Sequence, residues 1–233
     1  MTQHIVAVGG SRGLGKAFAA EATSLGHTVS VVSRTPAGPG QYACDITKAT
    51  DVARTLAEVH RERGEIHGLA FFQRFRGAGD AWEGELQTSL SGTRTVVQES
   101  LPFFASAGSR AIVMVSSIAA RFVAPDATCG YHVAKAGICQ MARYYAVQLG
   151  PQGIRVNAVC PGSFIKPESE AHFQAHPEIV RRLSEASPLK RMGTFRDVVN
   201  AVLFLLSDQA SFITGQSLFV DGGVSLRWQE DLT

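Results

Sequence analysis

Short apolar runs alternate along the chain with longer stretches in which apolar residues recur every three or four positions. The runs predict strands and the longer stretches predict amphipathic helices. The expected strands span 4–8, 28–33, 66–72, 110–116, 154–160 and 217–220. The expected helices lie near 13–25, 49–63, 81–106, 130–150 and 196–207. Because the runs are apolar at successive positions, they fit strands buried on both faces, and the alternation predicts an α/β fold with a doubly wound parallel sheet.

The segment 163–192 interrupts this alternation. It contains Pro167, Pro177 and Pro188, with a polar stretch of helical spacing between them. This pattern predicts a small helical lid over the ends of the strands. No repeat, low-complexity tract or linker divides the chain. We therefore expect a single domain over 1–233.

The composition is that of an ordinary globular protein. Of the 233 residues, 45% are hydrophobic and 18% are charged, which excludes a disordered chain. The formal net charge of +2 is too close to neutral to indicate nucleic acid or a membrane surface as a partner. No apolar run approaches the roughly 18 residues of a membrane span, and no secretory signal is recognisable. We expect a soluble, cytoplasmic protein.

The cysteines and histidines indicate neither disulfides nor a metal site. The four cysteines lie far apart and show no C-x-x-C spacing, so we expect reduced thiols. The seven histidines lack the paired spacing of metal ligands. We expect no bound metal.

A glycine-rich loop, VGGSRGLG at 8–15, follows the first expected strand and leads into the first expected helix. Glycines at Gly9, Gly13 and Gly15 allow a tight turn and a close approach of the backbone to a phosphate. The pyrophosphate of a dinucleotide would then bind the free N–H groups at the start of the helix. The position between strand and helix favours this interpretation over a simple turn.

The end of the second strand favours NADP(H) over NAD(H). A site for NAD places Asp or Glu there to bind the ribose hydroxyls, but 28–44 contains no acidic residue. Arg34 follows Ser33 at this position, and Arg12 lies in the glycine loop. Two arginines suit a 2′-phosphate, although they could also be solvated surface charges.

Asp45 and Ile46 lie between the expected strands 28–33 and 66–72, after the position at which a dinucleotide-binding sheet has its third strand. They could hydrogen-bond to an adenine ring and cover it. Asp45 could equally cap the helix that begins near Ala49. Both interpretations remain open at this point.

Ser117, Tyr131 and Lys135 form the candidate catalytic group. Tyr131 and Lys135 are four residues apart on an expected helix, so their side chains share one face. Ser117 ends an expected strand 14 residues before the tyrosine. A free tyrosine phenol is a poor acid–base group at neutral pH, but a nearby ammonium favours its ionised form. The serine hydroxyl could hold the oxygen that receives the proton.

These motifs, together with IRVNAVCPG at 154–162, ITGQ at 213–216 and VDGG at 220–223, resemble the short-chain dehydrogenase/reductase family. The similarity is greatest to its 3-oxoacyl-acyl-carrier-protein reductase branch and covers nearly the whole chain. It implies a Rossmann fold, a homodimer or homotetramer, and hydride transfer between NADP(H) and a carbonyl or alcohol. Ser117, Tyr131 and Lys135 would be catalytic. The implied cofactor-binding residues are Gly9, Ser11, Arg12, Gly13, Leu14, Gly15, Arg34, Asp45, Ile46, Phe72, Tyr131, Lys135, Pro161, Gly162 and Phe164.

Three positions depart from the family pattern. The usual Asn-Asn-Ala-Gly turn is replaced by FFQR, from Phe71 to Arg74, whose two phenylalanines could obstruct the dinucleotide. The helix asparagine that relays protons through water to the lysine aligns with Ser89, which we take as a fourth catalytic candidate. The threonine that faces the cofactor aligns with Lys166, a cation near the pyrophosphate.

Further basic residues lie at the expected carboxyl ends of the strands, where ligands bind in such sheets: Arg74, Arg76, Arg121 and Lys166. They could bind an anionic substrate, such as a carboxylate or the phosphate of a carrier-bound pantetheine. Alternatively, they are solvated or bind the cofactor phosphates. By resemblance, the Tyr131 helix and the helix expected over 81–106 would form a dimer bundle, with the apolar face of Ile138, Met141 and Tyr145 at the interface.

We predict an NADPH-dependent oxidoreductase that acts on a ketone, β-ketoacyl or alcohol substrate. Two alternatives follow from the departures. One is a specialised or non-redox reaction on an aromatic or polyketide-like substrate, suggested by the phenylalanines and the basic rim. The other is a dinucleotide-binding regulator without turnover, suggested by the missing asparagines. The intact Ser117, Tyr131 and Lys135 argue against the regulator.

Overall fold

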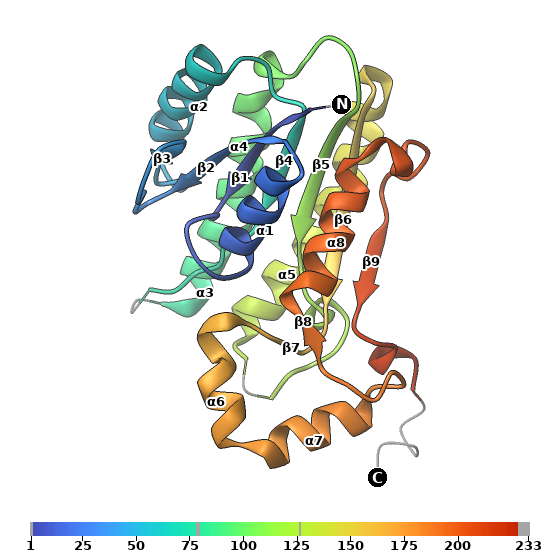
Figure 1. The fold of residues 1–233 in the computed structure, drawn as a ribbon. Helices are drawn as coiled ribbons and strands as arrows, with labels where there is room; N and C mark the ends of the chain where they lie inside the picture. The colour runs from blue at the N-terminus through green and yellow to red at the C-terminus, as the bar shows by residue number, and fades with distance from the viewer. Residues whose placement is uncertain (1, 78–79, 126, 228–233) are drawn as a thin grey trace.

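The structure, a computed structural model, describes residues 2–77, 80–125 and 127–227. Its centre is a seven-stranded parallel sheet of order β3-β2-β1-β4-β5-β6-β9, a Rossmann-like arrangement (Figure 1). The strands are β1 (His4–Val8), β2 (Thr28–Ser33), β3 (Gln41–Ala43), β4 (Gly68–Phe71), β5 (Arg110–Val115), β6 (Ile154–Pro161) and β9 (Ser217–Val220). The predicted α/β class is thus confirmed. Where a strand was predicted, its bounds agree within two residues.

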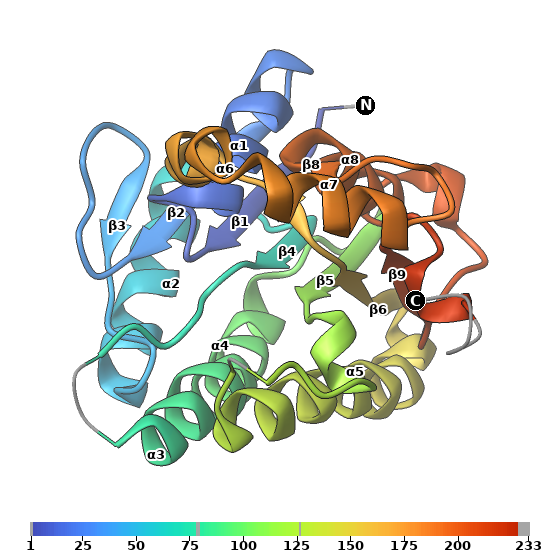
Figure 2. The same ribbon diagram turned by 90° about the horizontal axis from the view of Figure 1, so that it is seen from below.

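Helices cover both faces of the sheet (Figure 2). One face carries α1 (Gly13–Ser24) and α8 (Phe195–Leu206). The other carries α2 (Ala49–Arg63), α4 (Gly92–Ser100) and α5 (Cys129–Leu149). Throughout the described part of the chain, we find no helix with both the length and the apolarity needed to cross a bilayer.

Two elements differ from the predictions. The strand β3 was not among those predicted, because it has only three residues and begins with a polar one. The single helix expected over 81–106 is divided into α3 (Ala81–Glu85), a π-helical turn (Leu86–Ser91), α4 and a 3₁₀ turn (Leu101–Phe103). Pro102 enforces the last break, because it has no N–H to continue the helix.

Side chains of the central strands alternate between the two faces, and this decides where the phenylalanines of the FFQR segment point. Phe71, 1% exposed, faces the α2–α4–α5 layer with Val8 and Met114. Phe72 comes one residue later and packs on the opposite face, where its ring centroid is 4.9 Å from that of Phe18 in α1. Phe71 is therefore a core residue on the far side of the sheet from Phe72.

The IRVN run at the start of β6 holds the last part of the chain against the sheet. Asn157 is fully buried; its Nδ2 donates to the carbonyl oxygen of Ile213 at 2.9 Å, and its Oδ1 accepts from the Gln216 N–H at 3.0 Å. The Arg155 guanidinium donates to the carbonyl oxygens of Leu205, Leu206 and Ser207 at the end of α8. These contacts hold β9 and α8 against β6.

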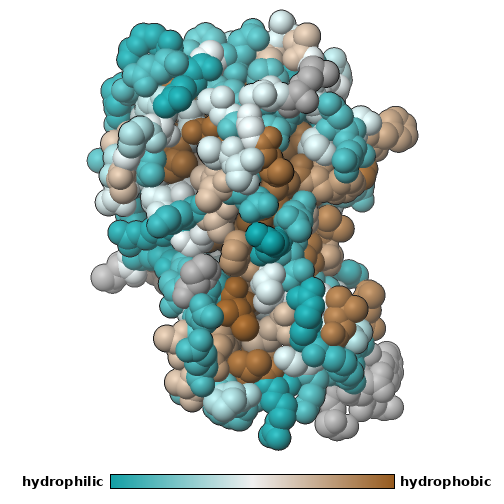
Figure 3. All heavy atoms as spheres, viewed as in Figure 1, coloured by the Kyte–Doolittle hydropathy of each residue, from teal (hydrophilic) through white to brown (hydrophobic). Residues whose placement is uncertain are grey.

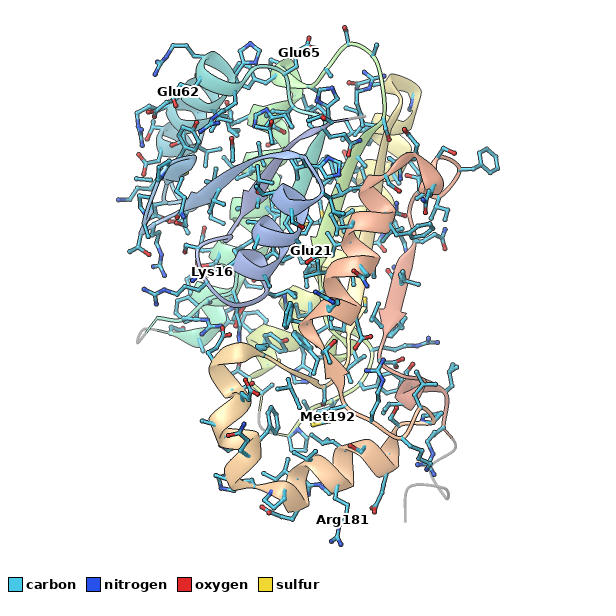
Figure 4. The ribbon with its side chains drawn as sticks, in the orientation of Figure 1. Lys16, Glu21, Glu62, Glu65, Arg181 and Met192 are labelled. Carbon is cyan, nitrogen blue, oxygen red and sulfur yellow. The ribbon has the colours of Figure 1, made fainter. Side chains whose placement is uncertain are left out.

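The segment 163–192 stands off from the carboxyl ends of the strands as a separate lobe (Figure 1). It contains β7 (Phe164–Ile165), a 3₁₀ turn (Pro167–Ser169), α6 (Glu170–Ala175) and α7 (Pro177–Ala186), and β7 pairs with β8 (Gly193–Thr194) to close its base. In Figure 4, Arg181 points away from the molecule, whereas Met192 lies between this lobe and the sheet. Hydrophobic residues gather between the lobe and the sheet, with hydrophilic residues around them (Figure 3).

The apolar face of α5 that we assigned to a dimer interface proves to be internal. Ile138 and Tyr145 are 2% and 7% exposed and belong to the core against the sheet. That prediction was wrong because these residues fall on the helix face turned toward the strands. The exposed apolar residues of α5 are instead Val133, Tyr144 and Val147.

We predict that Asn157→Ala lowers the free energy of unfolding by about 2–3 kcal/mol, because it leaves the Ile213 carbonyl and the Gln216 N–H buried without partners. Urea unfolding measures this loss. Asn200→Ala, at an exposed position of α8, is the control and should change stability by less than about 0.5 kcal/mol. Equal effects of the two substitutions would contradict the structural role of Asn157.

Candidate active site

A pocket of about 330 Å³ opens where the carboxyl ends of the central strands meet the lobe. Ligands bind at this edge in open α/β sheets. Its walls come from the glycine loop, the ends of β4, β5 and β6, the start of α5 and the lobe. The lining residues are Arg12, Gly13, Leu14, Phe72, Gln73, Arg74, Arg76, Val115, Ser116, Ser117, Tyr131, Lys135, Pro161, Gly162, Ser163, Phe164, Lys166, Glu168, Phe173 and Leu183.

The first turns of α5 bring Tyr131 and Lys135 into this pocket. Thr128 caps the helix, its Oγ1 accepting from the Tyr131 N–H at 3.2 Å. Four residues on, Lys135 is 5% exposed and its Nζ donates to the carbonyl oxygen of Val115 at 3.0 Å. The Nζ lies 5.7 Å from the centroid of the Tyr131 ring. The predicted pair thus shares one face of the helix.

Two serines at the end of β5 complete the group. The Ser117 Oγ accepts from the Ala119 N–H at 3.1 Å, so its own O–H is available to donate to a ligand. The Ser116 Oγ donates to the carbonyl oxygen of Lys135 at 2.7 Å and ties α5 to the strand. Ser116 was not among the predicted residues. Its adjacency to Ser117 is no signal by itself, because only the packing of α5 gives it a partner.

Burial and neighbouring charges act on the Lys135 ammonium in opposite directions. Burial lowers the pKa of Lys135 to about 8, Glu85 acts to raise it, and Arg74 acts to lower it. The Arg74 guanidinium also lies over the Tyr131 ring, 5.0 Å from its centroid. Arg74 belongs to the FFQR segment, so this departure from the family pattern adds a cation beside the tyrosine.

The pocket rim is basic. Arg12, Arg74, Arg76 and Lys166 all line it. Burial, with the charges of Arg74 and Arg76, lowers the pKa of Lys166, while Glu168 acts in the opposite direction. Such a cluster suits an anionic ligand.

Arg121, which was expected to lie with these cations, does not line this pocket. It lines a different cavity of about 850 Å³, where its guanidinium lies 6.0 Å from the centroid of the Phe219 ring. The two cavities share Ser163 in their linings. Arg121 therefore does lie at the carboxyl ends of strands, those of β6 and β9, but not in the pocket that the other three cations line.

The glycine loop is tightly packed and leaves the start of α1 without a side-chain cap. Gly15 packs on the loop, since a Cβ there would lie 2.6 Å from the Gly9 carbonyl oxygen. Gly13, with φ of +53°, faces the lobe, and a Cβ on it would lie 2.5 Å from a Glu168 carboxylate oxygen. No side chain caps the start of α1, and its first turn has no acidic residue. A negatively charged oxygen therefore already lies over the loop, which fits the phosphates of a dinucleotide.

Other predicted cofactor residues lie outside the pocket lining: Gly9, Ser11, Gly15, Arg34, Asp45 and Ile46. Arg34 is exposed at the end of β2. Asp45 accepts from the Thr47 N–H and hydroxyl, and Lys48 is the residue preceding α2, so Asp45 does not cap that helix. Ile46 is 8% exposed and packs against Gly92.

Ser89 is also apart from the pocket lining. It is 1% exposed, and its hydroxyl donates to the Glu85 carboxylate at 3.2 Å. The sequence reasoning missed Glu85, which is itself 4% exposed. The only available signal was its spacing, since it stands four residues before Ser89 on the expected helix.

Among residues 2–77, 80–125 and 127–227, no three His, Cys, Asp or Glu side chains are grouped so that they could hold a metal ion. The thiols of Cys139 and Cys160 are both free, and a hydrogen bond of 3.6 Å joins their sulfur atoms. The chemistry that this site offers is proton donation by a phenol beside two cations, hydrogen bonding by Ser117, and anion binding at the loop.

Comparisons with known proteins agree with the fold. A family model described as enoyl-(acyl carrier protein) reductase matches residues 8–225. The 2-(S)-hydroxypropyl-CoM dehydrogenase 3 of Xanthobacter autotrophicus is 29% identical, over 95% of this chain and 96% of that protein. The 3-oxoacyl-[acyl-carrier-protein] reductase of Staphylococcus aureus is also 29% identical, over 96% of this chain and 98% of that protein. Ligand-free aldohexose dehydrogenase of Thermoplasma acidophilum superimposes with a TM-score of 0.87 at 25% identity, over 98% of this chain and 96% of that one.

Proposed function

Because the chain belongs to the short-chain dehydrogenase/reductase family, we propose that it is an NADPH-dependent oxidoreductase acting on a ketone, β-ketoacyl or alcohol substrate. The observation that carries this proposal is the convergence of Ser117, Tyr131 and Lys135 on one pocket beside the glycine loop. The relatives named above include both a reductase and a dehydrogenase, so the family supports either direction of the reaction.

Each residue of the group has a distinct role in reduction. The Tyr131 hydroxyl gives its proton to the carbonyl oxygen, and the Ser117 O–H holds that oxygen by a hydrogen bond. The buried Lys135 ammonium and the Arg74 guanidinium stabilise the phenolate that remains. In alcohol oxidation the same phenolate removes the hydroxyl proton.

The dinucleotide would occupy the pocket between the glycine loop and the end of β6. Gly13 and Leu14 would hold its phosphates, and Pro161, Gly162 and Phe164 would line the nicotinamide end. When bound, the cofactor supplies or accepts the hydride at the substrate carbon. Glu168 now lies against Gly13, so its carboxylate must move away when a phosphate arrives.

We assign the preference for NADP(H) to Arg12 and Arg34. Both are exposed, one in the loop before α1 and one at the end of β2. No acidic residue occurs over 28–44 to bind a free ribose hydroxyl pair. The remaining proposed contacts of the adenosine half are Gly9, Ser11, Gly15, Asp45 and Ile46.

The basic rim favours an anionic substrate, such as an acid or a carrier-bound acyl group. Arg76 and Lys166 lie on one side of the pocket, and Phe173 and Leu183 of the lobe add an apolar wall. A ligand with an apolar body and a negative end matches both features. We propose that the chain is one domain, with 163–192 as a lid over this substrate.

Two further proposals concern the assembly and its surroundings. Val133, Tyr144 and Val147 form an exposed apolar strip on α5, which supports a homodimer or homotetramer. The closely spaced free thiols of Cys139 and Cys160 suit a reducing compartment such as the cytoplasm.

Tyr131→Phe tests the proposed reaction. It removes the proton donor and should lower kcat for ketone reduction about 10²- to 10⁴-fold, with NADPH affinity nearly unchanged. NADPH oxidation is followed across a panel of 3-oxo acids, their esters and simple ketones. Tyr144→Phe, on the exposed side of the same helix, is the control and should retain activity. Turnover that persists in Tyr131→Phe would exclude this mechanism.

Arg34→Ala tests the cofactor preference. Loss of a charged contact with the 2′-phosphate should weaken NADPH binding about 10- to 100-fold and leave NADH binding unchanged. Fluorescence titration with each nucleotide measures this difference. Arg181→Ala, whose side chain points into solvent in Figure 4, should change neither affinity. Equal weakening of both nucleotides by Arg34→Ala would contradict 2′-phosphate recognition.

Lys166→Gln tests the anionic substrate. For a reactive 3-oxo acid and its methyl ester, the ratio of their kcat/KM values should fall about tenfold in favour of the ester. The ratio cancels any effect of Lys166 on the cofactor. Arg121→Gln, in the other cavity, should leave the ratio unchanged. A constant ratio in Lys166→Gln would remove this residue from substrate recognition.

A further inference from the structure

Glu85 is a buried carboxylate that the proposed reaction leaves without a role. It ends α3 and is 4% exposed. Within the described residues its only hydrogen bond comes from Ser89, whose hydroxyl donates to Oε2 at 3.2 Å. Burying an ionised carboxylate is costly unless a counter-charge and hydrogen bonds compensate. One neutral hydroxyl is too little, so the compensating charge must come from elsewhere in the interior.

The helix packing shows where that charge lies. The 81–91 region runs beside α5 in the same direction, because Trp82 contacts Gly130 and Leu90 contacts Gly137 (Figure 2). A Cβ on Gly130 would lie 2.9 Å from the Trp82 Cα, and one on Gly137 would lie 2.8 Å from a Leu90 methyl carbon. Glu85 is between these two contacts. It is therefore level with the part of α5 that carries the tyrosine and the lysine.

Several elements place charged or titratable groups near Lys135, and Tyr131 of α5 is one of them, with its ring centroid 5.7 Å from Nζ. Glu85 approaches from α3, Arg74 from the loop after β4, Cys139 from α5 itself and Cys160 from β6. Glu85 is the one carboxylate among them. Burial depresses the pKa of Lys135 to about 8 and Glu85 acts against this shift. No ion pair joins the two directly, so the carboxylate acts across the space between them.

We propose that Glu85 is a positioning residue whose buried carboxylate keeps Lys135 in its ammonium form, and whose hydrogen bond orients the Ser89 hydroxyl. The effect of Glu85 on catalysis rests on the function proposed above, but its effect on the protonation of Lys135 does not. Because the Ser89 hydroxyl donates its proton to Glu85, its oxygen can only accept a further hydrogen bond. Ser89 was expected to relay protons through water to the lysine. In the proposal its hydroxyl oxygen is instead a hydrogen-bond acceptor, oriented by the Glu85 carboxylate.

The direct test measures the protonation of Lys135 in the cofactor-free protein. The chain has five lysines, so ¹³Cε signals of labelled lysine can be followed individually against pH, and Lys135→Arg identifies the relevant one. Wild type should titrate near pH 8. Glu85→Gln should move the midpoint down by about one pH unit, so that the ammonium fraction at pH 8 falls about fivefold. Glu85→Asp should lie between the two.

Glu83→Gln is the matched control. Glu83 is two residues away on the same helix, is exposed, and accepts from the Gln87 amide. Its substitution should leave the Lys135 midpoint unchanged. If Glu85→Gln does not fold, Glu85→Leu replaces it, because it removes the charge without leaving a buried amide unpaired, and Lys135 can lose its proton when its counter-charge is gone. It should lower the midpoint as Glu85→Gln does.

The pH dependence of turnover gives the second readout. Reduction needs the Lys135 ammonium, so its rate falls on the alkaline side as that ammonium loses its proton. Glu85→Gln should move this alkaline limb to lower pH by about one unit, with kcat at pH 6 close to wild type. A merely structural defect would lower the rate at all pH values and leave the limb in place.

The two proposals can fail separately. If Lys135 titrates identically in Glu85→Gln, Glu85→Leu and wild type, Glu85 is not its counter-charge, whatever the activity. If the Lys135 midpoint shifts as expected but wild type turns over no ketone or alcohol, Glu85 is the counter-charge of Lys135 and the proposed function is wrong. A shifted midpoint with an unshifted alkaline limb would overturn the role of Glu85 in the reaction.

Discussion

The site depends on holding one ammonium, that of Lys135, out of water at the end of a parallel sheet. A buried charge costs several kcal/mol unless hydrogen bonds and an opposite charge compensate. The last carbonyl group of β5 accepts from Nζ, and Ser116 ties the backbone of α5 to the same strand. The position of Tyr131 follows from this anchor, because it stands one helical turn before the lysine. Strand β5 and helix α5 thus form one rigid unit around a single charge.

The parts of the fold that depend on local patterns could be predicted from the sequence. Six strands and the main helices follow from apolar periodicity, which is a property of each segment alone. β3 could not be found this way, because its three residues become a strand only by pairing with β2. The π-helical turn Leu86–Ser91 was not predicted either, because it lies within a continuous helical pattern of apolar residues.

The residues of the candidate site likewise fall into those that local patterns predict and those that only the packing reveals. Ser117, Tyr131 and Lys135 were predictable because a strand end and a four-residue helical spacing place them without knowledge of the packing. Glu85 and Glu168 were not, because each acts on a residue far away in the chain. The FFQR segment shows both cases. The alternation of a strand explains why Phe71 is internal, but only the packing places Arg74 over the Tyr131 ring.

The charges of the pocket connect the proposed anion site with a carboxylate of the lobe. Arg12, Arg74, Arg76 and Lys166 all line the pocket, and burial, followed by the charges of Arg74 and Arg76, lowers the pKa of Lys166. Glu168 is the carboxylate of the lining that offsets them, and it does so from a position against Gly13. An arriving phosphate carries the same sign of charge and competes for the same cations. Under the proposed function, a bound phosphate would replace Glu168 as the counter-charge, and Glu168 belongs to the same lobe as the apolar wall of the pocket.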